Sequence, residues 1–297
     1  MRNNTLLFDI FEMAGIVVVF DFDKTIIDCD SDNWVVDELG ATGLFEQLLP
    51  TMPWNTLMDR MMEELHLQGR TIEEIAECLK QAPLDPRIID AIKSAYALGC
   101  DLKIVSDANM FFIETILKHH GLTDYFSEIN TNPSYIVEEN KLRIFPHHDF
   151  TSSPHGCVLC PPNMCKGIVM ERIKASAFKE GKKQFIYLGD GKGDFCPSLR
   201  LREGDRLMPR KNYPLWELIC SNPLSIKAEI HEWSDGEELK RILLYQIDSI
   251  VYGDQIGDSI IYGDKNTSDM LVSSDSKFQS SLLSAHNSVP QVLRVVN

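Results

Sequence analysis

Three runs of apolar residues predict strands that are buried on both faces. They occupy residues 17–20, 102–105 and 185–188, with Lys103 as the one polar interruption, and they are rich in β-branched and aromatic side chains. Continuous apolar runs of this length are typical of the inner strands of a parallel sheet. Stretches of helical periodicity lie between them, so the pattern predicts an α/β fold with a Rossmann-like parallel sheet.

Polar residues follow each of these runs at once. The first run ends in Asp21-Phe22-Asp23, where two carboxylates stand one residue apart. Ligand sites in open α/β sheets lie just beyond the carboxyl ends of the strands, and side chains at i and i+2 of an extended segment share a face. Both carboxylates can therefore reach one reaction centre, where one can attack phosphorus and the other can move a proton. An acidic helix cap after the strand would require only one of them.

The later motifs supply further polar groups. The second run leads into Ser106 and Asp107, and the third leads into Asp190 and Asp194. Lys166 lies between these two motifs, at the head of a helical pattern. A carboxylate pair, a hydroxyl, a lysine and a second acidic pair, in this order, resemble the four motifs of the haloacid dehalogenase superfamily of phosphotransferases.

A narrower resemblance is to the phosphoethanolamine/phosphocholine phosphatase family, and it covers roughly residues 14–244. Plant members of that group include enzymes described as inorganic pyrophosphatases and thiamine monophosphate phosphatases. The resemblance is carried by three blocks of sequence, which are Asp28-Cys29-Asp30-Ser31-Asp32-Asn33-Trp34, then Cys157 to Lys166, then Asp194-Phe195-Cys196-Pro197.

The expected organisation has four parts. Residues 1–15 form an N-terminal extension, and residues 16–27 and 100–244 form the α/β catalytic core. Residues 28–99 interrupt the core between the first and second motifs with helical periodicity, which is the position of a helical cap. From 245 to 297 Ser, Asp and Gly dominate, so we expect a largely disordered tail.

Composition limits the function classes. The formal net charge of −15 argues against binding to nucleic acid, whose phosphates would be repelled, and against docking on anionic membranes. Eight cysteines without a recognisable secretory leader favour a reduced, cytoplasmic location, and no apolar run is long enough to span a membrane. The oligomeric state is not predicted.

Phosphoryl transfer requires positioning and charge stabilisation, and this assigns roles to the motifs. Position and resemblance both make Asp21 the nucleophile, and Asp23 would protonate the leaving oxygen and then deprotonate water. Ser106 would donate to a phosphate oxygen, while Lys166 would neutralise the phosphate and keep Asp21 ionised.

Two carboxylates facing a phosphate would repel it, so a cation is expected between them. Mg²⁺ fits because it prefers oxygen ligands and combines one or two carboxylates with phosphate and water. The expected ligands are Asp21, the main-chain carbonyl of Asp23 and Asp190, with Asp194 bound directly or through an intermediate group. Asp194 could instead only cap a helix.

Two further carboxylates are candidates for substrate selectivity. The family resemblance places substrate contacts at Asp32 and Asp107, where a carboxylate would stabilise an ammonium head group. Trp34 or Trp54 could add an aromatic face. The simpler interpretations are a helix N-cap for Asp32, a turn residue for Asp107 and packing of the cap for the tryptophans.

Cys157, Cys160 and Cys165, with His155 just before them, have a spacing that suggests zinc. Structural zinc usually has four ligands, often in two separated pairs, whereas these residues are compressed into one segment. Reduced structural thiols are therefore the preferred interpretation, and zinc and a redox-sensitive disulfide remain as alternatives.

The sequence as a whole predicts a Mg²⁺-dependent phosphatase of small phosphomonoesters, of the thiamine monophosphate, phosphocholine or phosphoethanolamine type. Its only expected partner is the small-molecule phosphate substrate. An inorganic pyrophosphatase is the alternative within the enzyme class. A non-catalytic binding protein on the same scaffold is a more remote one, because such a protein would be expected to have lost an aspartate or the lysine.

Overall fold

The computed structural model describes residues 15–253 of the 297-residue chain. Almost all of the expected N-terminal extension (1–15) and most of the expected tail (245–297) lie outside the described residues. Within them, no helix is both long enough and apolar enough to cross a membrane.

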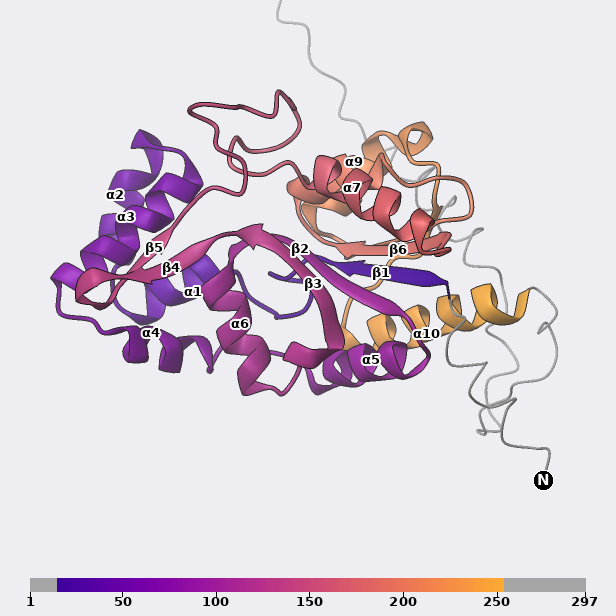
Figure 1. The fold of residues 1–297 in the computed structure, drawn as a ribbon, viewed down its shortest axis with the longest axis horizontal. Helices are drawn as coiled ribbons and strands as arrows, with labels where there is room; N and C mark the ends of the chain where they lie inside the picture. The colour runs from indigo at the N-terminus through magenta and orange to yellow at the C-terminus, as the bar shows by residue number, and fades with distance from the viewer. Residues whose placement is uncertain (1–14, 254–297) are drawn as a thin grey trace, which may run out of the picture.

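The core is a six-stranded parallel sheet in the order β3-β2-β1-β6-β7-β8, with helices on both faces (Figure 1). This confirms the predicted α/β fold, and the three apolar runs form its three central neighbours β2, β1 and β6. The strands are β1 (Ile16–Phe20), β2 (Asp101–Asn109), β3 (Phe126–Asn132), β6 (Gln184–Gly189), β7 (Arg206–Pro209) and β8 (Glu229–Ile230).

Strand β1 shows why the sheet is sandwiched between two helical layers. Its five residues are all buried, and they alternate between the two sides as a strand requires. Ile16, Val18 and Phe20 pack into one apolar cluster, whereas Val17 and Val19 pack into the other. The first cluster lies with α5 (Pro86–Ala97), α6 (Met110–His119) and α10 (Gly236–Tyr252), and the second with α7 (Lys166–Lys179) and α9 (Pro214–Ser221).

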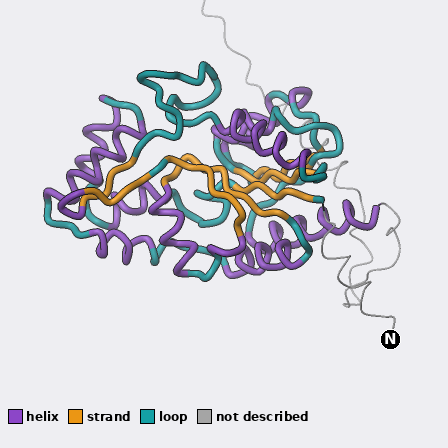
Figure 2. The backbone as a smooth tube through the Cα atoms, viewed as in Figure 1, coloured by secondary structure: helices purple, strands orange, loops and turns teal. Residues whose placement is uncertain are grey.

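The segment between the first two strands is helical, as the periodicity predicts. It contains α1 (Ser31–Glu38), α2 (Thr42–Leu48), α3 (Trp54–Leu67) and α4 (Ile72–Leu79) before α5. Helices α1–α4 form a group beside the carboxyl ends of the strands (Figures 1 and 2). A two-stranded hairpin, β4 (Ser134–Val137) with β5 (Lys141–Ile144), joins this group by packing on α3. Arg143 of the hairpin donates to Asp59 of α3 from Nε, at 2.8 Å.

Three expected boundaries differ from the structure. Helix α5 was expected in the cap, but it packs along α10 and β2 and therefore belongs to the core. The hairpin was expected in the core, but it contacts the cap. The tail was expected to begin at residue 245, whereas α10 continues to Tyr252, because Leu239, Leu243 and Ile247 are spaced to bury one face.

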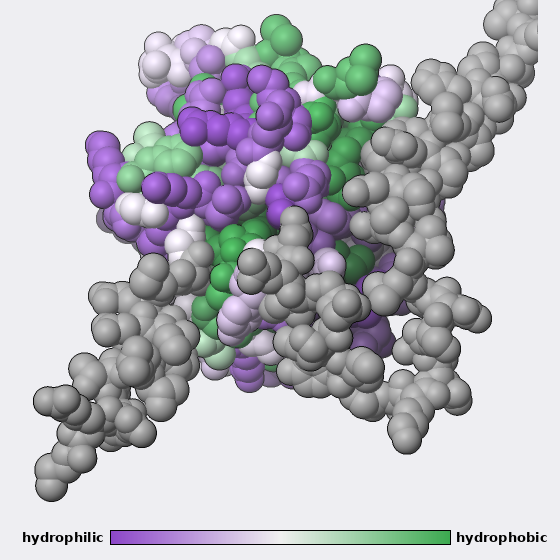
Figure 3. All heavy atoms as spheres, turned by 90° about the vertical axis from the view of Figure 1, so that its right-hand side faces the viewer, coloured by the Kyte–Doolittle hydropathy of each residue, from purple (hydrophilic) through white to green (hydrophobic). Residues whose placement is uncertain are grey.

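The two ends of the sheet have different surroundings. Figure 3 shows the end at which the strands begin, where hydrophilic and hydrophobic residues are interspersed over the visible surface. The polar motifs lie at the opposite end, next to helices α1–α4.

Candidate active site

Asp21 is the first residue after β1, and each oxygen of its carboxylate has a partner. Its main-chain N–H donates to the carbonyl of Leu188, which extends the ladder with β6. Oδ1 accepts a hydrogen bond from the N–H of Phe22 at 2.7 Å, and Oδ2 lies 2.8 Å from Lys166 Nζ. The residue is only 6% exposed. The carboxylate is therefore fixed at the end of the central strand, as a nucleophile would need to be.

Lys166 connects two of the acidic motifs. It is the first residue of α7 and is 4% exposed, and its Nζ lies 2.8 Å from Asp21 Oδ2 and also 2.8 Å from Asp194 Oδ1. Burial opposes the charge of the ammonium, but the carboxylates of Asp194 and Asp21 outweigh burial and raise the pKa of Lys166. The lysine is therefore a permanent buried cation at this site.

Asp194 accepts four hydrogen bonds, and they occupy both of its oxygens. Oδ1 accepts from Lys166 Nζ and from the hydroxyl of Tyr187 at 2.7 Å, and Oδ2 accepts from the N–H groups of Asp190 and Gly191 at 3.0 and 2.8 Å. A Cβ at Gly189 would meet Asp194 Cγ at 2.6 Å, so glycine is needed for this close approach. The arrangement favours Asp194 as the group that orients Lys166 and the Asp190 loop.

Asp190 completes a buried acidic group. One carboxylate oxygen each from Asp21, Asp190 and Asp194 lie within 4.8 Å of one another. Thr25 donates to Asp190 Oδ1 at 3.2 Å. Burial, followed by the charge of Asp194, raises the pKa of Asp190 to about 7. Burial and Asp194 likewise raise the pKa of Asp21.

This group fits a magnesium ion. Three buried carboxylates face one ammonium, so the negative charge exceeds what Lys166 neutralises. Burial first, and then the neighbouring carboxylate of Asp194, raise the pKa values of Asp21 and Asp190. The donors are all hard oxygens, which suits Mg²⁺ better than softer transition metals.

Asp23 is held where the first loop meets the cap. Its Oδ1 accepts from the N–H of Ser31, the first residue of α1, at 3.1 Å. Burial, and then the charges of Asp30 and Asp32, raise the pKa of Asp23. A carboxyl whose pKa is raised is better suited to act as a general acid than an ordinary one. Between Asp23 and the cap, Lys24 adopts a left-handed backbone with φ of 54°, which is unusual for a non-glycine residue.

Ser106 and Asp107 lie on the neighbouring strand. Phe20, the last residue of β1, is level with Ile104 of β2, so Ser106 and Asp107 lie where β2 continues beyond the end of β1, beside the Asp21 loop. Ser106 is buried, and its hydroxyl oxygen accepts from the N–H of Ala108 at 3.3 Å. Asp107 Oδ1 accepts from Asn163 Nδ2 at 2.6 Å and from Asn132 Nδ2 at 3.2 Å. Asp107 lies within β2 and is held by two amides, so its interpretation as a turn residue is wrong.

Asp32 is buried in α1 and is only partly paired. Its Oδ2 accepts from Trp54 Nε1 at 2.7 Å, whereas its Oδ1 is buried without a hydrogen-bond partner. Burial, followed by the charge of Asp30, raises the pKa of Asp32 to about 8. The N-cap of α1 is Asp30, which accepts from the N–H of Asn33, so the interpretation of Asp32 as the N-cap is wrong.

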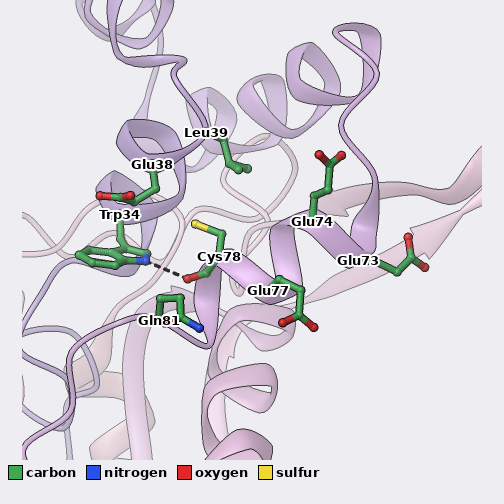
Figure 4. A pocket seen from close by; sticks show the side chains of 8 residues that line it. All are labelled: Trp34, Glu38, Leu39, Glu73, Glu74, Glu77, Cys78 and Gln81. Carbon is green, nitrogen blue, oxygen red and sulfur yellow. Dashed lines mark hydrogen bonds between the residues drawn. The ribbon is translucent and has the colours of Figure 1, made fainter.

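The two candidate tryptophans, Trp34 in α1 and Trp54 in α3, make different contacts. Trp54 contacts Asp32, but Trp34 donates from Nε1 to the carbonyl of Cys78 at 3.0 Å and lines a pocket between α1 and α4 (Figure 4). The pocket has a volume of about 420 Å³, and none of the predicted catalytic residues lines it. Its other lining residues include four glutamates, which are Glu38, Glu73, Glu74 and Glu77.

The structure thus brings Asp21, Lys166, Asp190 and Asp194 into direct contact or close proximity. Four supporting residues were not anticipated from the sequence as parts of the site. They are Thr25, Tyr187, Asn132 and Asn163. Trp54, a candidate for an aromatic face, instead donates a hydrogen bond to Asp32. Asn163 carried a usable signal, since it lies within the block that supports the family resemblance.

Comparison with known proteins shows the family of the chain. Residues 16–247 match the family described as "Putative Phosphatase". The chain belongs to this family. Inorganic pyrophosphatase 2 of Arabidopsis thaliana is 61% identical over 242 residues, which are 81% of this chain and 87% of that protein. A thiamine phosphate phosphatase-like protein of the same plant is 60% identical over 239 residues, which are 80% and 98% of the two chains.

A more distant relative and a solved structure are also similar to this chain. The human phosphoethanolamine/phosphocholine phosphatase is 31% identical over 242 residues, which are 78% of this chain and 88% of that protein. Among solved structures, a HAD family hydrolase from Salmonella enterica superposes with a TM-score of 0.53 at 15% identity, over 81% of this chain and 72% of that one. The fold is therefore the haloacid dehalogenase fold, and the protein is a phosphatase of this type.

Proposed function

We propose that this phosphatase uses Mg²⁺ and hydrolyses small phosphomonoesters with a cationic leaving group through a phosphorylated Asp21. The observation that carries the proposal is the position of Lys166 Nζ, 2.8 Å from both Asp21 and Asp194, beside a buried group of three carboxylates. A fixed carboxylate, a permanent ammonium and an excess of oxygen donors are what phosphoryl transfer to an aspartate needs.

The first half-reaction forms the covalent intermediate. An oxygen of Asp21 attacks phosphorus, and the bond from phosphorus to the ester oxygen breaks. The protonated carboxyl of Asp23 gives its proton to that leaving oxygen. Ser106 would donate to a phosphate oxygen, and Lys166 would offset the charge that the phosphate brings.

The second half-reaction returns the enzyme to its starting state. The Asp23 carboxylate takes a proton from water, and the water oxygen attacks the phosphorus of the aspartyl phosphate. The bond from phosphorus to Asp21 breaks, which releases inorganic phosphate and restores the carboxylate. The raised pKa of Asp23 suits both directions of this transfer.

Asp21, the main-chain carbonyl of Asp23 and Asp190 would hold the magnesium ion, with Asp194 orienting the loop that carries Asp190. The ion supplies charge neutralisation between the carboxylates and the phosphate.

Selectivity is assigned to Asp32 and Asp107. Asp32 is buried and Asp107 is half-buried, and the unpaired Oδ1 of Asp32 is the kind of atom that a substrate cation would satisfy. An ammonium or thiazolium group would offset the repulsion between these carboxylates and an anionic substrate. This favours phosphocholine, phosphoethanolamine or thiamine monophosphate, and two of the relatives above carry names of that kind.

Inorganic pyrophosphate is the second candidate substrate. It is favoured by one observation, the 61% identity to a plant protein named inorganic pyrophosphatase 2. A panel of kcat/KM values for the four compounds with Mg²⁺ distinguishes the two candidates. Higher values for the three cationic esters support our proposal, and a dominant value for pyrophosphate would replace it.

The covalent step has its own test. Asp21→Asn should keep the fold and abolish turnover of every compound in the panel, because an amide is a poor nucleophile toward phosphorus. The exposed Asp124→Asn is the matched control and should retain full activity. Activity of the Asp21 variant within about tenfold of wild type, a barrier change of only about 1.4 kcal/mol, would reject Asp21 as the nucleophile.

A further inference from the structure

Four cysteine side chains converge beside the active site. The Sγ atoms of Cys157, Cys160, Cys165 and Cys196 all lie within 4.8 Å of one another. Cys196 Sγ is 3.7 Å from Cys157 Sγ and 3.9 Å from Cys165 Sγ. The first three cysteines precede α7 in the chain, and the fourth comes from the short helix α8 (Phe195–Ser198). The three closely spaced cysteines of the sequence are therefore joined by a fourth cysteine from a separate segment.

These separations match the edges of a zinc tetrahedron. Four Zn–S bonds of about 2.3 Å at tetrahedral angles place the sulfur atoms about 3.8 Å apart. A disulfide would require about 2.05 Å between two of them, and all eight cysteines are free. The set also has room for one ion, whereas the thiolates of a multi-iron cluster are spread more widely around its bridging sulfides.

We propose that Cys157, Cys160, Cys165 and Cys196 bind one structural Zn²⁺. Four thiolates close the coordination sphere and leave no position for water or substrate, so the site has no role in the chemistry. This replaces free thiols as the preferred interpretation of the cysteines, because the objection to zinc was the lack of a fourth, separated ligand.

Gly167 supports the closeness of the cluster. A Cβ at this position would lie 2.5 Å from Cys196 Sγ and 3.4 Å from the Cys196 carbonyl oxygen. Only a residue without a side chain lets α7 approach Cys196 so closely. The backbone of α7 at residue 167 therefore leaves the space that the Cys196 sulfur occupies.

The surroundings of the cluster explain what the ion would do. Residues 145–165 form a long connection without regular structure between β5 and α7 (Figure 2). Val158, between two of the ligands, is 95% exposed, so apolar burial does not hold this part of the loop. An ion would supply the missing anchor, as metals do where a core is too small.

The same ion would brace two functional residues. Cys165 directly precedes Lys166, and Cys196 lies two positions after Asp194. The ion would therefore tie together the chain at both ends of the Lys166–Asp194 ion pair, and the cysteines would be positioning residues for it.

The first test is the metal content of the full chain, purified under reducing conditions and passed through EDTA to remove loosely held ions. Elemental analysis should find one zinc per chain in wild type and in Cys220→Ser, whose cysteine in α9 lies outside the cluster. Cys160→Ser and Cys196→Ser should have lost zinc. Zinc-free wild type, iron in place of zinc, or full zinc retention in Cys196→Ser would each overturn the proposal.

A second test does not depend on the folding of cysteine variants. In wild type loaded with zinc, the four cluster cysteines should resist alkylation and should become reactive when a strong chelator removes the metal. Equal reactivity with and without zinc would show that the thiols hold no ion.

A glycine pair gives the matched control. Gly167→Ala should push Cys196 away and weaken zinc affinity by about 10–100-fold, the effect of disturbing the shell around a metal. Gly43→Ala, also within a helix and with nothing within 4 Å of its added Cβ, should leave affinity unchanged. Equal affinities in the two variants would contradict the site.

Discussion

The hydroxyl of Tyr187 donates a hydrogen bond to Asp194 Oδ1 at 2.7 Å from within the central strand β6. Tyr187 is fully buried, and burial followed by the charge of Asp194 raises the pKa of its phenol well above the usual value. It therefore remains a hydrogen-bond donor at all working pH values. A core residue that seemed to serve only packing thus helps to hold the carboxylate that orients Lys166.

Removing this hydroxyl should affect the site without disrupting the core. Tyr187→Phe keeps the ring but leaves Asp194 Oδ1 with Lys166 as its remaining donor, and it should lower the free energy of unfolding by about 1 kcal/mol. We expect kcat to fall by less than about tenfold with KM nearly unchanged, because the lysine still bridges the two aspartates.

Urea unfolding and steady-state kinetics measure these two quantities, and the exposed Tyr245→Phe is the control. A complete loss of activity in Tyr187→Phe would show that the tyrosine touches the reacting groups.

The metal assignment predicts a different response at Asp190. Asp190→Ala removes one oxygen donor from the buried acidic group and should raise the Mg²⁺ concentration needed for half-maximal activity by at least about tenfold, or abolish activity. Excess EDTA should stop wild type, and Mg²⁺ should restore it. Ca²⁺ should inhibit, because its larger and looser coordination lets the nucleophile use both oxygens. Full turnover in EDTA would reject the metal.

The site was predictable as far as it depends on strand ends. The apolar runs fixed β1, β2 and β6, and parallel strands bring their carboxyl ends together, so Asp21 and Asp190 were expected to meet. The donors to Asp194 were not predictable, because Tyr187 looks like any buried residue of an apolar run. Cys196 lies in one of the sequence blocks that carry the family resemblance, but its place in the cysteine cluster was not predictable, since a single cysteine 31 residues after Cys165 forms no local pattern.

Helical layers were harder to place than strands. The periodicity of α5 shows that one face is buried, but it does not say whether that face meets the sheet or the cap. Its partner α10 comes about 140 residues later, and the pairing is decided by tertiary packing. The composition from residue 245 onward suggested a disordered tail. The sequence after α10 is polar, as this interpretation requires, but residues 245–252 form the last two turns of α10.

The raised pKa of Asp32 predicts a pH dependence of stability. The group binds its proton more tightly in the folded state (pKa about 8) than in the unfolded chain (pKa about 3.9), so folding takes up a proton between these values. The proton on Asp32 therefore adds to the free energy of unfolding at low pH. This contribution is lost as the pH rises toward 8, at up to about 1.4 kcal/mol per pH unit.

Asp32→Asn should remove this slope. The amide oxygen can still accept from Trp54, so the cap contact is kept. Urea unfolding at pH 5.5 and 7.5 should show a smaller loss in the variant than in wild type. Identical slopes in the two proteins would mean that Asp32 is already ionised across this range.

The selectivity proposal makes the most discriminating prediction, because it assigns Asp32 and Asp107 to the leaving group and Asp21 and Asp23 to the chemistry. Changing Asp32 or Asp107 to Asn keeps an oxygen for Trp54, or for Asn132 and Asn163, so the local hydrogen bonds can persist. What is lost is the negative charge that each aspartate would present to a bound cation. For Asp32, whose pKa is about 8, the cation would first displace the proton. At 4 Å and an effective dielectric of 20, a charge pair is worth about 4 kcal/mol, and exposure and salt reduce this.

Even a third of that energy corresponds to about tenfold in kcat/KM. We therefore expect each variant to lose at least about tenfold toward phosphocholine or thiamine monophosphate and far less toward a neutral-headed phosphate ester. Pyrophosphate has no cation to lose, so its hydrolysis should stay the same or improve as a repulsive charge is removed. Equal losses for all substrates would place the two aspartates in the metal site or the fold, and inorganic pyrophosphatase would then become the better description of this enzyme.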